Sequence, residues 1–258
     1  MNAKRMEILT LIHTNERHAT IGRWTLDHMW FPANSDDGRA KLVVCFGGRK
    51  YGYIRSLYLE SRDHPNLLYL QDNLGENGVN LWWMAWHGDF SVSDAYHTLI
   101  ERYIDESGVD IANVSYIGNC IGGFGALYYS FMLGGGTAVA VCPIIALGTV
   151  YGGLPMAEWI VGDSGLDLDE HIFNHFDRHT DVKLHLFSAH TDNIVVTGRL
   201  ARFVELMITR CNLFSLRNVE IVHGAEIKTH SAIAYAINGN TMLLEAERPL
   251  EYECILGS

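Results

Sequence analysis

One stretch of the sequence combines a nucleophile with the small neighbours that an exposed nucleophile needs. It spans residues 114–127 and reads VSYIGNCIGGFGAL, so that Cys120 lies between Gly118 and Gly122. Within this stretch, a segment with β-branched residues precedes the Gly-x-Cys-x-Gly turn, and a segment rich in small residues follows the turn. This is the Gly-x-Ser-x-Gly pattern of a nucleophile elbow, with sulfur in place of the hydroxyl oxygen. A helix N-terminus favours an anion, so we expect a reactive thiolate at Cys120; a buried structural cysteine is the alternative.

An acid and a base follow this nucleophile along the chain. Asp192 comes after a strand predicted at residues 182–187, and His230 comes after the last predicted core strand, residues 219–222. In this interpretation His230 takes the proton of Cys120 or holds it as an ion pair. Asp192 then orients the imidazole and stabilises its charged form.

Each of these two roles has a rival in the sequence. His223, directly at the end of the last strand, is the other candidate base, and Asp163 is a more distant candidate acid. Asp192 also has a purely structural interpretation as a helix N-cap, a common role for aspartate. Three histidines share a helical face at i, i+4 and i+8: His171, His175 and His179. Metal binding is a minor alternative for this face, because no supporting carboxylate pattern surrounds it.

The order nucleophile, acid, histidine resembles the α/β-hydrolase superfamily over nearly the whole chain. In that superfamily the loop after the strand at residues 41–46 supplies one backbone N–H of the oxyanion hole. The resemblance therefore implies Gly48 as one donor, with Arg49 as the second choice, and the N–H of Ile121 as the other donor. A simple strand-to-helix turn is the alternative for this loop.

Two narrower resemblances concern the elbow. Its cysteine is similar to that of dienelactone hydrolases, and residues 122–127, GGFGAL, resemble bacterial capsule polysaccharide O-acetyltransferases. The second likeness extends to Asp72 before an aromatic loop, which implies a place for Asp72 in substrate binding, to a short cap, and to His230 before a final short helix. Cys120 departs from it, because those enzymes have serine there.

The elements that must position these residues alternate between strands and helices. This pattern predicts one domain over residues 1–258, an α/β-hydrolase fold with a doubly wound, mostly parallel sheet, helices on both faces and a cap insertion at about residues 149–180. Besides the elbow strand and helix, strands are expected at residues 7–13, 22–30, 41–46, 66–70, 137–142, 182–187 and 219–222, and helices at 51–60, 93–107, 198–210 and 232–237. The tail at 241–258 suits an edge strand or a homodimer contact.

Aromatic and basic residues suggest what the site would bind. Trp82, Trp83 and Trp86 wall an acyl or sugar pocket or else fill a second core under a long loop. Up to residue 62 there are ten Lys/Arg against six Asp/Glu, which leaves nine against twenty-four of the totals of 19 and 30. Arg49 lies in this basic region and suits an anionic substrate or donor; a solvated helix face is the alternative.

Composition limits the partners. A formal net charge of −11 argues against nucleic acid. We expect neither a signal peptide nor a membrane span. Five cysteines without a short paired spacing favour a reducing, cytoplasmic compartment and no structural metal.

The expected function is acyl transfer through an acyl-cysteine thioester. Such a thioester exchanges readily with another, so acyl-CoA or an acyl carrier protein would be the donor, with no resident cofactor. The acceptor would be a hydroxyl or amine of a small molecule or saccharide, with water kept out. Hydrolysis of esters or thioesters is the main alternative, and an inactive hydrolase-fold binding protein is the non-enzyme alternative.

Overall fold

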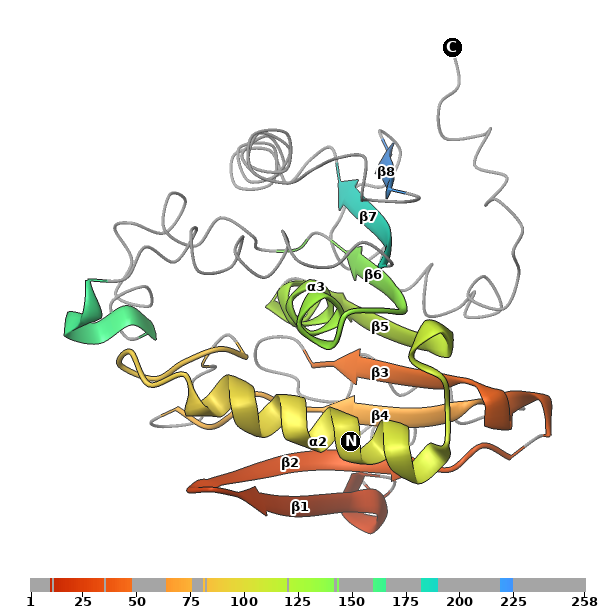
Figure 1. Cartoon of the computed structure of the whole chain (residues 1–258), viewed down its shortest axis with the longest axis horizontal. Helices are drawn as coiled ribbons and strands as arrows, with labels where there is room; N and C mark the ends of the chain where they lie inside the picture. The colour runs from red at the N-terminus through yellow and green to blue at the C-terminus, as the bar shows by residue number, and fades with distance from the viewer. Residues whose placement is uncertain are drawn as a thin grey trace.

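Eight strands form one sheet in the computed structural model, which describes residues 10, 12–34, 36–47, 64–75, 81, 83–119, 121–141, 143, 160–165, 182–189 and 219–224. The strand order is β1-β2-β4-β3-β5-β6-β7-β8 (Figure 1). The strands are β1 Glu16–Ile21, β2 Trp24–Phe31, β3 Leu42–Phe46, β4 Asn66–Leu70, β5 Val114–Asn119, β6 Thr137–Val141, β7 Lys183–Ala189 and β8 Val219–Gly224.

Parallel pairing dominates this sheet. β1 pairs with β2 and β2 with β4 in antiparallel fashion, whereas the pairs from β4 through β3, β5, β6 and β7 to β8 are parallel. β3 and β4 are buried along their whole length, as expected for strands covered on both faces. The predicted α/β class and the mostly parallel sheet are confirmed.

Two α-helices pack beside each other against the sheet. Figure 1 shows α2, Ser91–Ser107, over β2 and β4, and α3, Ile121–Leu133, over β5. Aromatic rings form a contact between the two helices: Tyr96 of α2 packs edge to face against Tyr129 of α3, with ring centroids 6.3 Å apart. α2 ends as predicted at Gly108, whose φ of 65° is left-handed. The helices predicted at 51–60, 198–210 and 232–237 lie outside the described residues.

The start of the chain corrects one prediction. The strand expected at residues 7–13 is wrong, since Thr10 and residues 12–15 are helical. There the hydroxyl of Thr14 donates to the carbonyl of Thr10, one turn earlier. The first strand among the described residues is β1, a polar edge strand whose only buried residue is Ala19. Among the described residues, no helix combines the length and apolar character that a bilayer span requires.

Candidate active site

The parallel strands end at one edge of the sheet, and the predicted catalytic residues follow three of those ends. Pairing aligns Phe46 with Gly118, and Phe187 with Val222. Cys120 comes directly after β5, Asp192 three residues after Ala189 at the end of β7, and His230 six residues after Gly224 at the end of β8. The candidate nucleophile, acid and base therefore each follow a strand that ends at the same edge of the sheet.

The segment after β8 is long enough for His230 to reach the end of β5. In the order β5-β6-β7-β8, β8 lies three strand spacings from β5, roughly 14 Å. Six extended residues span up to about 20 Å, so His230 can return to the end of β5. His223, the rival base, lies within β8 itself, where it pairs with Ser188.

The elbow itself is closed by backbone contacts at its two glycines. A Cβ built on Gly118 would lie 2.0 Å from the carbonyl oxygen of Gly122, and one on Gly122 would lie 2.3 Å from the carbonyl oxygen of Phe46. Neither glycine has a positive φ among the described residues. Glycine is required here by close packing of β5, α3 and β3, which is what a sharp strand-to-helix turn demands.

The same contacts bring together the neighbours of the two predicted oxyanion donors. Gly47, which precedes Gly48, has its carbonyl oxygen 3.1 Å from a Cβ built on Gly122, which follows Ile121. Ile121 is the first residue of α3 and is 1% exposed. Its N–H belongs to the first turn, where helix N–H groups lack partners within the helix.

The electrostatics of this helix end favour an anion. The first turn of α3, residues 121–124, contains no acidic side chain that would neutralise the positive end of its dipole. Asn119, just before Cys120, carries a buried side-chain oxygen with no hydrogen-bond partner in the described part of the chain. Six predicted site residues lie outside the described residues: Gly48, Arg49, Trp82, Cys120, Asp192 and His230.

Asp72 anchors the aromatic loop. Its side chain is 2% exposed, and one carboxylate oxygen accepts the N–H of Leu81 while the other accepts that of Trp83, both at 2.9 Å. A carboxylate is suited to this because it accepts with both oxygens. Substrate binding by Asp72 stays a prediction; the contacts give it a structural task that the sequence did not reveal.

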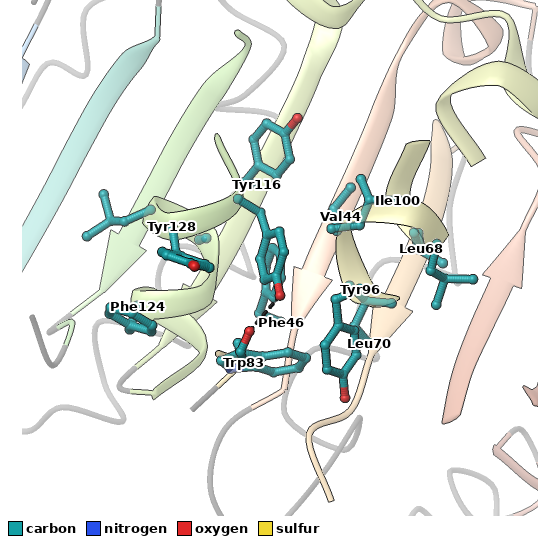
Figure 2. Close-up of a cluster of buried hydrophobic side chains, with 14 of the residues drawn as sticks. Val44, Phe46, Leu68, Leu70, Trp83, Tyr96, Ile100, Tyr116, Phe124 and Tyr128 are labelled. Carbon is teal, nitrogen blue, oxygen red and sulfur yellow. Dashed lines mark hydrogen bonds between the residues drawn. The ribbon is translucent and has the colours of Figure 1, made fainter. Parts of the chain in front are cut away.

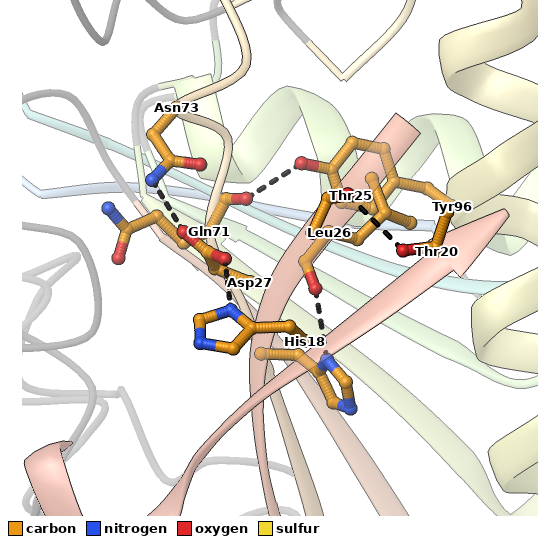
Figure 3. Close-up of polar contacts among 9 residues, drawn as sticks. His18, Thr20, Thr25, Leu26, Asp27, Gln71, Asn73 and Tyr96 are labelled. Atoms are coloured by element: carbon orange, nitrogen blue, oxygen red, sulfur yellow. Dashed lines mark hydrogen bonds and ion pairs between the residues drawn. The ribbon is translucent and has the colours of Figure 1, made fainter. Parts of the chain in front are cut away.

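The residues on either side of Asp72 are held as well. Figure 3 shows the hydroxyl of Tyr96 donating to the carbonyl of Gln71, at 2.7 Å, and the amide of Asn73 donating to the Asp27 carboxylate, at 2.8 Å. Asp27 also accepts from the ring of His18 across the β1–β2 pair, at 2.7 Å. The end of β4 is thus tied to α2 on one side and to β2 on the other.

Trp83 lies in the core, which is the alternative that the sequence left open for the tryptophans. Its side chain has no exposed surface, and its ring meets Phe46 and Tyr96 edge to face at 5.1 and 5.0 Å (Figure 2). Its backbone φ is 64°, a conformation that bulky residues rarely adopt. Trp86 is half-buried and packs against the core.

Tyr129 is a structural residue that sequence reasoning missed. Its hydroxyl donates to the carbonyl of Trp83 at 2.6 Å, 46 positions away in the sequence. Burial raises the pKa of Tyr129 well above its ordinary value, so the hydroxyl keeps its proton. The sequence offers no signal for this contact beyond a tyrosine pair on the helix after the elbow.

The described part of the predicted cap insertion docks on the turn after the tryptophans. The N–H of Gly88 donates to the carbonyl of Ile160 at 2.7 Å, and Ile160 is buried. A Cβ on Gly162 would lie 2.8 Å from the backbone carbon of His87. Asp163, the rival acid, lies exposed in this segment.

The metal alternative gains no support from the described residues. Among them, no group of three histidine, cysteine or acidic side chains is placed to hold a metal ion. The three histidines at 171, 175 and 179 lie outside these residues.

No protein-family model and no curated sequence matches the chain. Solved structures match it in fold. The capsule O-acetyltransferase of Neisseria meningitidis serogroup A has a TM-score of 0.63 at 12% identity, covering 91% of this chain and 99% of that chain. The S-formylglutathione hydrolase from Agrobacterium tumefaciens has a TM-score of 0.62 at 12% identity, covering 89% and 92%.

Two further structures extend this comparison. The acylaminoacyl peptidase of Pyrococcus horikoshii has a TM-score of 0.63 at 15% identity and covers 96% of this chain, which spans 46% of that peptidase. A mutant of the meningococcal enzyme in complex with CoA has a TM-score of 0.61 at 12% identity, covering 90% of this chain and 99% of that chain. The chain thus has the α/β-hydrolase fold, which it shares with an acetyltransferase, a hydrolase and a peptidase.

Proposed function

We propose that this chain, with its α/β-hydrolase fold, is an acyltransferase that works through an acyl-Cys120 thioester. The observation that carries the proposal is the close backbone packing at Gly118 and Gly122, the two residues that flank the 119–121 segment, which is what a nucleophile elbow at position 120 would require. So tight a turn is expected where a nucleophile must be exposed beyond its neighbours.

The roles of the catalytic residues follow from the strand ends that precede them. His230 takes the thiol proton of Cys120, or holds the thiolate as an ion pair, while Asp192 orients the imidazole. The thiolate attacks the acyl carbonyl, and the N–H groups of Gly48 and Ile121 hold the oxyanion that develops. The donor's thiolate then leaves, taking the proton from His230, and the acyl group stays on Cys120.

A thioester donor suits a cysteine nucleophile. Exchange of one thioester for another involves little change in free energy, and a capsule O-acetyltransferase of the same fold has been solved with CoA. Acyl-CoA or an acyl carrier protein would then supply the acyl group, with Arg49 facing the anionic donor. A hydroxyl or amine of a small molecule or saccharide would accept it, against Trp82 or Trp86.

Hydrolysis is the second candidate. The fold is shared with an S-formylglutathione hydrolase, whose name also specifies a thioester, and with a peptidase. The acyl-Cys120 intermediate would be the same, and water would replace the acceptor. The two functions therefore differ only in the second step.

The deciding experiment follows the release of CoA from acetyl-CoA with and without acceptors. Wild type, Cys120→Ala and His230→Ala would be compared with a set of saccharides and amines. For a transferase, we expect CoA release that rises at least 10-fold with one acceptor class and an acetylated product. Release of acetate at the same rate without any acceptor would identify a hydrolase. Release unchanged in Cys120→Ala would contradict both functions.

A further inference from the structure

A strained tryptophan lies beneath the elbow. Trp83 is fully buried, yet its φ of 64° lies in the left-handed region that favours glycine. Residues in such conformations persist only where the surrounding structure holds them, and they gather at functional sites. The surrounding contacts must therefore hold this residue in its strained conformation.

Two buried side chains hold its backbone. The Asp72 carboxylate accepts the N–H of Trp83 at 2.9 Å, and the Tyr129 hydroxyl donates to its carbonyl at 2.6 Å. The indole N–H, by contrast, is buried with no acceptor among the residues that the structure describes. Hydrogen bonds hold the Trp83 backbone, whereas the contacts that the described residues make with its ring are packing contacts.

That ring packs against the end of β3 and against α3 at once. It meets Phe46 at the end of β3, and a Cβ built on Gly125 of α3 would lie 3.0 Å from the Trp83 ring and 2.7 Å from the Phe46 ring. Phe46 in turn presents its carbonyl oxygen to Gly122. Figure 2 shows Trp83 and Phe46 together, with Tyr96 of α2 beside Trp83.

We propose that Trp83, held by Asp72 and Tyr129, is a positioning residue for the oxyanion hole. It sets how closely the end of β3 approaches the N-terminus of α3, and those two segments lead to the predicted donors Gly48 and Ile121. This inference rests on the proposed function and deepens it. Oxyanion donors act only at a fixed distance from the developing charge, so a small shift between the segments slows acylation.

The test separates acylation of Cys120 from its plain reactivity. Tyr129→Phe and Asp72→Asn loosen the hold on Trp83 without removing the indole. Tyr116→Phe is the matched control, because the Tyr116 hydroxyl is buried with no partner in the described part of the chain. Acetylation by acetyl-CoA requires the oxyanion hole, whereas alkylation by iodoacetamide does not, and peptide mass spectrometry follows both at Cys120.

We expect the rate of Cys120 acetylation to fall about 10- to 100-fold in Tyr129→Phe and Asp72→Asn. The rate of Cys120 alkylation should stay within about twofold of wild type at each pH of its pH profile. Tyr116→Phe should match wild type in both reactions. Asp72 and Tyr129 together form the clamp on Trp83. An unchanged rate of acetylation in both clamp variants, or an equal loss of both reactions, would overturn the positioning role.

Amide hydrogen exchange makes the outcome independent of catalysis. If wild-type Cys120 is alkylated but not acetylated by any donor, the proposed function fails, and the clamp is judged by exchange alone. Tyr129→Phe should then speed exchange at Gly47 and Ile121–Gly125 at least threefold relative to Tyr116→Phe. Exchange equal in the two variants would overturn the inference. Tyr129→Phe is the milder of the two clamp variants, and it carries the test if Asp72→Asn does not fold.

Discussion

Gly122 lies so close to Phe46 that a Cβ on the glycine would come within 2.3 Å of the phenylalanine's carbonyl oxygen. Gly122→Ala must therefore push α3 away from β3. Because backbone atoms cannot yield as a side chain does, we expect a loss of about 2 kcal/mol or more in the free energy of unfolding. Urea denaturation would measure it.

The control for this variant is Gly135→Ala. There the atoms nearest to the added Cβ belong to the side chain of Ile111, the closest at 3.0 Å, and this side chain can shift. Its cost should stay below about 1 kcal/mol. Equal losses in the two variants would mean that the close approach at the elbow is not what requires glycine.

Two buried tyrosine hydroxyls with opposite surroundings form a natural pair. Tyr129→Phe leaves the carbonyl of Trp83 without its donor and should lower the free energy of unfolding by about 1–3 kcal/mol. Tyr116→Phe removes a buried hydroxyl that lacks a partner among the described residues, so stability should stay level or rise. Thermal unfolding of both variants would check this, and a larger loss in Tyr116→Phe would contradict it.

Asp72 should be intolerant of its own amide. Asn at this position keeps one acceptor oxygen but turns an N–H donor toward Leu81 or Trp83, so at least one 2.9 Å hydrogen bond is lost. We expect Asp72→Asn to lower the free energy of unfolding by about 2 kcal/mol or more. Asp94→Asn, on the exposed side of α2, is the control and should stay within about 0.5 kcal/mol of wild type. Similar values for both would argue against the anchoring role of Asp72.

His28 should make the protein less stable in mild acid. Burial lowers the pKa of His28 below its ordinary value of 6.5, although the carbonyl of Leu26 partly offsets this. The unfolded chain therefore binds the proton first. The neutral His28 therefore causes no loss in the free energy of unfolding above about pH 6.5. Below that pH the free energy of unfolding falls as the pH drops toward the lower pKa of His28 in the folded state.

The measurement compares wild type with His28→Gln by urea denaturation at about pH 7.5 and pH 5.5. The variant should lose less stability between the two values, because the group that binds the extra proton on unfolding is gone. The same loss in both proteins would show that other groups cause the acid sensitivity.

The docking of residues 160–165 depends on Gly88. Its φ is 77°, and a Cβ there would lie 2.8 Å from the carbonyl oxygen of Val161. Gly88→Ala should release the segment around Ile160 and speed its amide hydrogen exchange, with little change in β3 and β5. Gly22→Ala is the control, because its φ of 61° imposes similar strain with open space around the Cβ. Unchanged exchange around Ile160 in Gly88→Ala would show that this contact does not hold residues 160–165.

The sequence predicts those elements whose own pattern is strong. β4, Asn66–Leu70, agrees with its predicted bounds, and α2 differs only at its start, because apolar runs and helical spacing are local signals. β1 was missed because it is a polar edge strand, with one buried residue to mark its period.

The strand and helix on either side of position 120 were predictable for the same reason, since the pattern of Gly118, Cys120 and Gly122 lies within five residues of the chain. The clamp on Trp83 was not, because Asp72, Trp83 and Tyr129 meet only after β4, the aromatic loop and α3 have packed together. A strained φ also leaves no trace in residue type when the residue is tryptophan rather than glycine.

The most direct test of the account is the mass of Cys120 after brief incubation with acetyl-CoA. Intact-protein and peptide mass spectrometry would compare wild type, Cys120→Ala and His230→Ala. We predict one added acetyl group on Cys120 in wild type, none in Cys120→Ala, and formation slowed at least 100-fold in His230→Ala. A wild-type Cys120 that stays unmodified by acetyl-CoA and by an activated aryl ester would contradict the account, leaving the elbow as a structural turn.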